Sequence, residues 1–214
     1  MTVFSVTRSE FILGGQKSGK SRRAEMLARA WLQQSPAHDA VLIATAQPWD
    51  EEMRQRIARH QQDRAERVPG LRTLEEPLQL AQALAGSSRP HTLVVVDCLT
   101  LWLTNWLMPA EPLSKDGQPE QPDEQADAQA RRSPANASPA QIALLLKAIE
   151  NATGPVVLVG NEIGLGVIPL GRETRAFVDA LGQLNQAVAQ ACERVTLMAA
   201  GLPLTLKGRH DAGV

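Results

Sequence analysis

Residues Gly14 to Ser21 combine glycines, a lysine and a serine in the order Gly-x-x-x-x-Gly-Lys-Ser. This pattern is typical of a loop that binds the phosphates of a nucleotide. Glycines let backbone N–H groups turn inward around a phosphate, and a helix that starts directly after the loop adds a partial positive charge. Lys20 can reach the β- and γ-phosphates, and Ser21 can give an oxygen ligand to Mg²⁺. The predicted phosphate loop (P-loop) therefore comprises Gly14, Gly15, Gln16, Lys17, Ser18, Gly19, Lys20 and Ser21.

The P-loop has the neighbours that this chemistry requires. The apolar run Phe11–Leu13 predicts a short buried strand before it, and the segment Arg22–Gln34 has apolar residues at helical spacing after it. A chance glycine turn before a helix is the alternative. The strand and helix on either side disfavour that alternative, because the motif needs this context to bind phosphate.

A second group with metal chemistry follows another apolar run. Thr92–Asp97 predicts a buried strand that ends in a carboxylate. In a P-loop protein, an Asp at this point is expected to hold Mg²⁺, often through water. The alternative is that Asp97 caps the helix predicted for Cys98–Leu107. Because the strand occurs together with a P-loop, we favour a Mg²⁺ site at Ser21 and Asp97.

The segment after Asp50 is rich in arginine and contains one histidine. Asp50 is expected to cap a helix over Met53–Val68, in which Arg56 and Arg64 lie one turn on either side of His60. Neighbouring guanidinium groups disfavour a second cation, and a neutral imidazole can attack phosphorus. The arginines could hold a triphosphate. Composition alone instead favours a solvated basic helix face with a surface histidine.

The rest of the chain alternates apolar runs with helical patterns. Further strands are predicted for 41–46, 155–161, 194–199 and 204–207, and further helices for 71–85, 139–151 and 173–192. This alternation predicts an α/β fold with a mainly parallel sheet covered by helices on both faces. The end of the second strand, Ala44 to Ala46, would then open at the same edge as the P-loop.

The chain of 214 residues is predicted to form a single domain, 1–214, with one interruption. Residues 109–138 are rich in proline and polar residues, so we expect a mobile surface insertion there and no second fold. Cys98 and Cys192 lie in apolar stretches, which predicts reduced core thiols and neither a disulfide nor a metal pair.

Charge and composition exclude some classes of function. The formal net charge is −1, aromatic residues make up 3% and tyrosine does not occur, which argues against nucleic-acid binding. No apolar run approaches the length of a membrane span, and the N-terminus lacks the apolar region of a signal peptide. We therefore expect a cytoplasmic protein.

Several motifs taken together resemble one family. Besides the P-loop they are Glu52-Met53-x-x-Arg56-Ile57-x-x-His60-x-x-x-Arg64, Glu75-Glu76-Pro77, Asp97-Cys98-Leu99-Thr100 with Asn105, Asn161-Glu162-Ile163-Gly164, Arg175 through Gln186, and Gly201-Leu202-Pro203. Nearly the whole chain resembles the bifunctional cobinamide kinase and cobinamide-phosphate guanylyltransferase of adenosylcobalamin biosynthesis. Two departures are that Leu71 replaces a tryptophan often found in the family, and that the connection leading to Glu75 is longer.

The resemblance implies two reactions. A nucleoside triphosphate, ATP or GTP, phosphorylates a hydroxyl of the corrinoid substrate, and GMP is then transferred from GTP through a histidine that matches His60. It also implies Mg²⁺, a homo-oligomer, catalytic roles for His60 and Lys20, and contacts to nucleotide or metal beyond the P-loop. The residues matching those contacts are Ala44, Thr45, Ala46, Gln61, Gln62, Asp63, Arg64, Glu75 and Asp97.

Two rivals remain. A P-loop kinase for a small molecule, without a covalent histidine, would explain the P-loop and Asp97 but leave the cluster around His60 without a role. A nucleotide-dependent switch without enzymatic chemistry is the other. A GTPase switch should carry an Asn/Thr-Lys-x-Asp motif that recognises guanine, and the sequence contains none.

Overall fold

The computed structural model describes residues 4–48, 51–108 and 134–208. Asp50, which we expected to cap a helix, lies outside these residues. The predicted insertion at 109–138 also lies outside them as far as residue 133. From Pro134 the chain is already helical, so the insertion as predicted extends five residues too far.

One sheet of seven strands forms the centre of the described fold, in the order β3-β2-β4-β5-β1-β6-β7. Every neighbouring pair is parallel except β6 and β7, which confirms the prediction of a mainly parallel sheet. The strands are β1 (Ser9–Gly14), β2 (Asp39–Ala44), β3 (Leu71–Glu75), β4 (Thr92–Asp97), β5 (Val156–Val159), β6 (Arg194–Ala199) and β7 (Leu202–Lys207).

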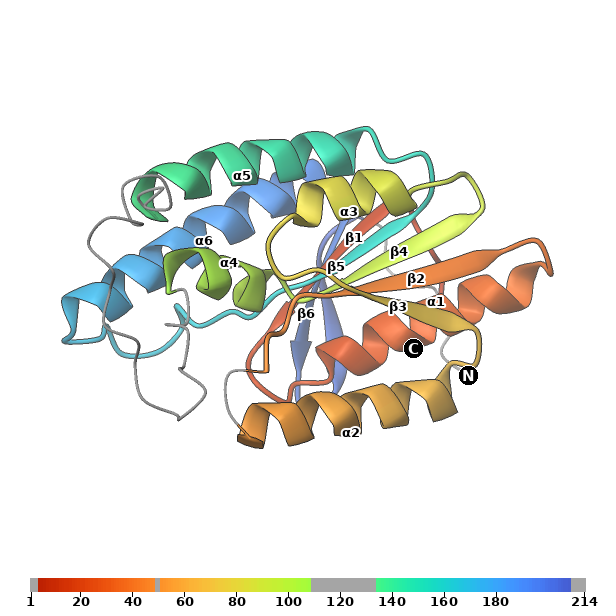
Figure 1. The fold of residues 1–214 in the computed structure, drawn as a ribbon, viewed down its shortest axis with the longest axis horizontal. Helices are drawn as coiled ribbons and strands as arrows, with labels where there is room; N and C mark the ends of the chain where they lie inside the picture. The colour runs from red at the N-terminus through yellow and green to blue at the C-terminus, as the bar shows by residue number, and fades with distance from the viewer. Residues whose placement is uncertain (1–3, 49–50, 109–133, 209–214) are drawn as a thin grey trace, which may run out of the picture.

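Helices cover both faces of this sheet (Figure 1). The helices α1 (Lys20–Gln34) and α2 (Glu51–Arg67) lie on one face, and α3 (Leu80–Ser87), α4 (Leu99–Leu107), α5 (Pro134–Glu150) and α6 (Arg172–Ala191) lie on the other. Alternate strand residues enter the two cores: Val156 and Leu158 of β5 face one, and Val157 and Val159 face the other. Successive side chains alternate between two buried faces, so apolar residues are required at both sets of positions. The strands therefore appear in the sequence as continuous apolar runs.

The helix predicted for Leu71–Ala85 is wrong in its first part. Residues Leu71–Glu75 form strand β3, and helix α3 begins only at Leu80. The leucine spacing in this segment suggested a helix, but β3 pairs in parallel with β2 from Ala40 to Ala44. Pairing with a distant strand outweighed the local pattern, because strand formation depends on context more than helix formation does.

Cys98 and Cys192 confirm the prediction of reduced thiols in the core. Both are free and buried. Burial raises the pKa of each thiol to about 12, so both stay neutral and unreactive near pH 7.

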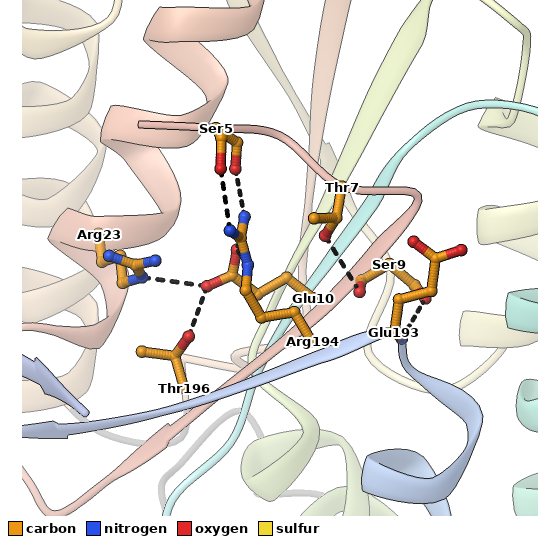
Figure 2. Close-up of polar contacts among 8 residues, drawn as sticks. All are labelled: Ser5, Thr7, Ser9, Glu10, Arg23, Glu193, Arg194 and Thr196. Atoms are coloured by element: carbon orange, nitrogen blue, oxygen red, sulfur yellow. Dashed lines mark hydrogen bonds and ion pairs between the residues drawn. The ribbon is translucent and has the colours of Figure 1, made fainter. Parts of the chain in front are cut away.

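A buried charge cluster joins α1 to the sheet (Figure 2). The Glu10 carboxylate on β1 is 1% exposed and accepts bonds from Arg23 Nε at 3.0 Å, Arg194 Nε at 2.9 Å and Thr196 Oγ1 at 2.8 Å. The Arg194 guanidinium also reaches Ser5, which brings the N-terminal segment over the cluster. The cluster thereby fixes the helix that follows the P-loop against β1 and β6.

We expect the Glu10 cluster to contribute strongly to the stability of the fold. Glu10→Gln removes the one carboxylate shared by two buried arginines, so we expect a loss of about 3–5 kcal/mol in the free energy of unfolding. Urea denaturation measures this loss. The matched control is Glu51→Gln, because Glu51 pairs with Arg54 at the surface and should matter by less than about 1 kcal/mol. Equal effects of the two substitutions would contradict the importance assigned to the cluster.

Candidate active site

The P-loop is a tightly packed turn between β1 and α1. Gly14 and Gly19 have φ angles of 150° and 100°, which side chains rarely allow. A Cβ atom at Gly14 would lie 2.4 Å from the carbonyl oxygen of Met198. Backbone bonds hold the loop from two sides: Glu162 N donates to Gly14 O at 3.1 Å, and Gly201 N donates to Ser18 O at 3.0 Å. The loop is therefore preshaped by its neighbours.

The start of α1 is suited to an anion. Gly19 occupies the N-cap position, no described side chain caps the helix, and its first turn contains no acidic residue. The N–H groups of a first helical turn have no partner within the helix, and they carry the positive end of the helix dipole. The Ser18 hydroxyl is buried here and has no hydrogen-bond partner among the described residues. These donors match the phosphate site that the sequence predicted.

Lys20 is held inside this loop. Its side chain is buried, and Nζ donates to the carbonyl oxygen of Gly15 at 2.6 Å. Burial lowers the pKa of the Lys20 ammonium from its ordinary value of 10.5, and the nearby Cys98 and Asp97 oppose this shift. A phosphate that replaces the Gly15 carbonyl would stabilise the charged form of Lys20.

Asp97 lies at the carboxyl end of β4, where Ala44 and Val159 are its partners in the neighbouring strands. Its charge acts on the pKa of Lys20, so the carboxylate is close to the P-loop lysine. The alternative role as a helix cap is not the one observed, because Cys98 takes the N-cap position of α4.

Thr45 connects two strand ends at this edge. Its side chain is fully buried; Oγ1 donates to Cys98 O at 2.7 Å and accepts from Cys98 N at 2.9 Å. Asn105 on α4 donates to Thr45 O at 2.8 Å, a role that the sequence did not assign. The Thr45 hydroxyl therefore fixes the backbone beside Asp97, while Ala44 and Ala46 are half-buried at the same edge.

A buried carboxylate on α1 holds α2. Arg67 Nη1 lies 2.8 Å from Glu25 Oε2, and Arg64 Nε lies 3.9 Å from Glu25 Oε1. Arg64 also donates from Nη1 to Thr73 Oγ1 of β3 at 3.1 Å. We refer to Glu25, Arg64 and Arg67 as the Glu25 clamp. The sequence does not reveal this clamp, because a glutamate in an amphipathic helix gives no sign of its partners.

The Glu25 clamp relates the positions of α1 and α2 along the molecule. Within α2, His60 lies seven residues or about 10 Å before Arg67, and within α1, Lys20 lies five residues or about 8 Å before Glu25. The helices α1 and α2 run in the same direction away from the carboxyl edge of the sheet (Figure 1). These offsets indicate that His60 lies within about one helical turn of the level at which α1 begins, and the residue is exposed.

A hydrogen bond confirms that this part of α2 lies at the carboxyl edge. Gln61 Nε2 donates to Glu75 Oε1 at 3.0 Å, and Glu75 is the partner of Ala44 at the ends of β3 and β2. Two further predicted residues on α2 bond within the helix: Gln62 Nε2 donates to Glu66 Oε1 at 3.4 Å, and Asp63 Oδ2 accepts from Arg67 Nη2 at 2.8 Å.

The structure also qualifies the predicted pair of arginines around His60. Arg64 is turned inward to the Glu25 clamp, so it holds the helix in place. The side chain of Arg56 lies outside the described part of the chain. Among the described residues, no group of three or more His, Cys, Asp or Glu is placed to hold a metal ion. No helix in the described ranges is both long and apolar enough to cross a membrane.

Comparisons with known proteins agree on one family. A family model described as cobinamide kinase / cobinamide phosphate guanyltransferase matches residues 10–206. The bifunctional adenosylcobalamin biosynthesis protein CobP of Pseudomonas aeruginosa is 44% identical over 199 residues, which cover 93% of this chain and 97% of that protein. The CobU proteins of Escherichia coli and Salmonella typhimurium, which carry the same description, are 35% and 33% identical, over 92% of this chain and 98% of each relative.

Among solved structures, a RadB recombinase matches with a TM-score of 0.42 and 13% identity. The match covers 91% of this chain and 75% of that one.

Lys20 makes a prediction about protons. In the enzyme without nucleotide, Lys20 is largely neutral at a pH above its lowered pKa and below about 10.5. A bound triphosphate should restore its positive charge. Nucleotide binding should therefore take up a proton in this window, and affinity should fall as the pH rises through it. Calorimetry in buffers of different ionisation enthalpy measures the uptake. In Lys20→Arg the side chain stays charged, so the uptake should disappear; the same uptake in that variant would contradict the role of Lys20.

Proposed function

The chain belongs to the cobinamide kinase / cobinamide phosphate guanyltransferase family, and we propose that one site at the carboxyl edge of its sheet serves both reactions, with His60 as the carrier of GMP. The protein is a bifunctional enzyme of cobalamin biosynthesis that uses nucleoside triphosphates. The observation that supports the proposal is the Glu25 clamp, which joins the helix that follows the P-loop to the helix that carries His60.

In the kinase reaction, the P-loop holds ATP or GTP by its phosphates. The first turn of α1 and the Lys20 ammonium stabilise the negative charge that moves during phosphoryl transfer. The corrinoid hydroxyl oxygen attacks the γ-phosphorus and its proton passes to solvent. The bond from this phosphorus to the β–γ bridging oxygen breaks, and the nucleoside diphosphate leaves with the electron pair. Lys20 exchanges the Gly15 carbonyl for a phosphate oxygen, whose negative charge offsets the effect of burial on the pKa of Lys20.

In the guanylyl reaction, a ring nitrogen of His60 attacks the α-phosphorus of GTP. The bond from this phosphorus to the bridging oxygen breaks, and pyrophosphate leaves with the electron pair. A phosphate oxygen of cobinamide phosphate then attacks the same phosphorus, the P–N bond breaks, and His60 is restored. The covalent step divides one displacement into two, so pyrophosphate can leave before the acceptor arrives.

The remaining predicted contacts are proposed to hold the nucleotide on the side where α2 lies. Gln61 and Glu75 already bond to each other at the edge of the sheet. The proposed contacts on this side also include Ala44, Ala46, Gln62 and Asp63. Two further residues, Thr45 and Arg64, are proposed to contribute. The last two act by positioning, because Thr45 fixes the backbone beside Asp97 and Arg64 fixes α2.

The residues present fit a Mg²⁺ ion. Ser21 and Asp97 offer hydroxyl and carboxylate oxygens, the hard ligands that Mg²⁺ takes together with substrate phosphates and water. Asp97 is close enough to act on the pKa of Lys20, so both ligands are proposed to face the phosphates. Mg²⁺ bound there would neutralise phosphate charge in either reaction. A homo-oligomer and a cytoplasmic location remain further proposals.

A second candidate is a P-loop kinase that forms no covalent histidine. One observation favours it, which is that the His60 ring is exposed. This candidate retains the P-loop, Lys20 and Asp97, but it gives no function to the Glu25 clamp, which holds α2 against α1.

Labelling with GTP that is radioactive at the α-phosphate separates these candidates. His60→Ala should abolish the acid-labile label on the protein and leave kinase activity, because only the guanylyl step needs the imidazole. The matched control is His91→Ala, since His91 is also exposed but precedes β4 at the opposite edge of the sheet. That variant should label like the unmodified enzyme. Undiminished labelling of His60→Ala would remove His60 from this role.

A further inference from the structure

The segment after β5 begins beside the phosphate site. Strand β5 lies between β4 and β1, next to the strand that leads into the P-loop. Gly160 N donates to Ile12 O at 3.0 Å, and Glu162 N donates to Gly14 O at 3.1 Å. The residues directly after Glu162 therefore lie beside the P-loop, where the phosphates are proposed to bind.

This next segment exposes large apolar side chains. Leu165, Val167, Ile168 and Leu170 are 84%, 95%, 76% and 97% exposed, and Ile163 is also exposed. We call residues 163–170 the apolar loop. These side chains add little to either core of the fold. A cluster of exposed apolar residues beside a reaction site is typical of a binding surface.

Polar contacts hold the backbone of the apolar loop at both ends. Gly164 N donates to Glu162 Oε1 at 2.8 Å. At the other end, Arg175 on the first turns of α6 donates to Pro169 O at 3.0 Å and also to Leu170 O. The apolar side chains are therefore exposed although hydrogen bonds hold the loop backbone at both ends.

A small hollow of about 50 Å³ lies between the apolar loop and α6. Ile163, Val167, Ile168 and Val178 line it together with the charged side chains of Arg175 and Asp179. Apolar walls with a few polar groups are typical of sites for small molecules. A carboxylate beside a guanidinium can bond to both ends of an amide group.

We propose that the apolar loop is the docking surface for the corrinoid substrate, a proposal that rests on the function proposed above. A corrinoid combines a broad apolar ring with amide side arms, so the ring edge would cover Leu165, Val167 and Leu170 while one amide arm enters the hollow. Docking there holds the arm that carries the reacting hydroxyl, and later the phosphate, next to the P-loop. Such positioning lowers the barrier of a transfer between two substrates.

The test compares two pairs of exposed apolar residues. In the double variant Val167→Ser with Leu170→Ser, the KM for cobinamide should rise by about tenfold or more, because two apolar contacts are lost. The KM for GTP and the α-phosphate labelling should not change. The matched control is Leu204→Ser with Leu206→Ser on β7, where both side chains are 55% exposed. This control should keep the KM for cobinamide.

Hydrogen exchange of the unmodified enzyme decides which molecule covers the apolar loop. Saturating cobinamide at a fixed protein concentration should slow exchange of the amides from Ile163 to Leu170. Slowing only when the protein concentration is raised would assign the loop to a second copy of the chain and overturn the proposal, as would an unchanged KM in the loop variant. Protection by cobinamide without any labelling of the enzyme would instead refute His60 as carrier and leave the docking surface standing.

Discussion

The contact of Arg64 and Arg67 with the buried Glu25 carboxylate joins the two helices on which the chemistry depends. Helix α1 begins at the phosphate site, whereas α2 carries the histidine, and the sheet alone does not fix their relative position. Because Glu25 and Arg64 are almost fully buried, removing the charge of Glu25 would leave the Arg64 guanidinium without this carboxylate in a region of low polarity. The same contact that stabilises this layer therefore sets how far His60 lies along the molecule.

The carboxyl edge of the sheet is prepared for negative charge in three ways. The first turn of α1 has donors without partners, the Ser18 hydroxyl is buried without a partner in the described structure, and Lys20 has a lowered pKa. Glycines at 14 and 19 allow the backbone to approach β6 closely. The unpartnered donors and the buried lysine cost free energy in an empty site. Bound phosphates would remove this cost by accepting hydrogen bonds and by pairing with the lysine. The Glu10 cluster keeps α1 in place during this exchange.

Much of this arrangement follows from local sequence, and the rest depends on distant partners. The P-loop, strand β4 with Asp97 and the alternation of strands and helices were predicted because motif and period lie within a few residues. Strand β3 was missed because its pairing with β2 is not local. The Glu25 clamp joins residues 42 apart in the chain, and the Glu10–Arg194 contact joins residues 184 apart. For His60, composition alone indicated a surface residue, and the family resemblance suggested chemistry.

In the proposed mechanism, a GTP bound in the P-loop has its α-phosphorus within reach of His60. The most direct measurement is a crystal structure with a GTP analogue that carries a methylene group between the α- and β-phosphorus. We expect a ring nitrogen of His60 about 3–3.5 Å from the α-phosphorus and in line with the methylene carbon that replaces the leaving oxygen. A bound analogue with the His60 ring directed into solvent in every copy of the chain would contradict it.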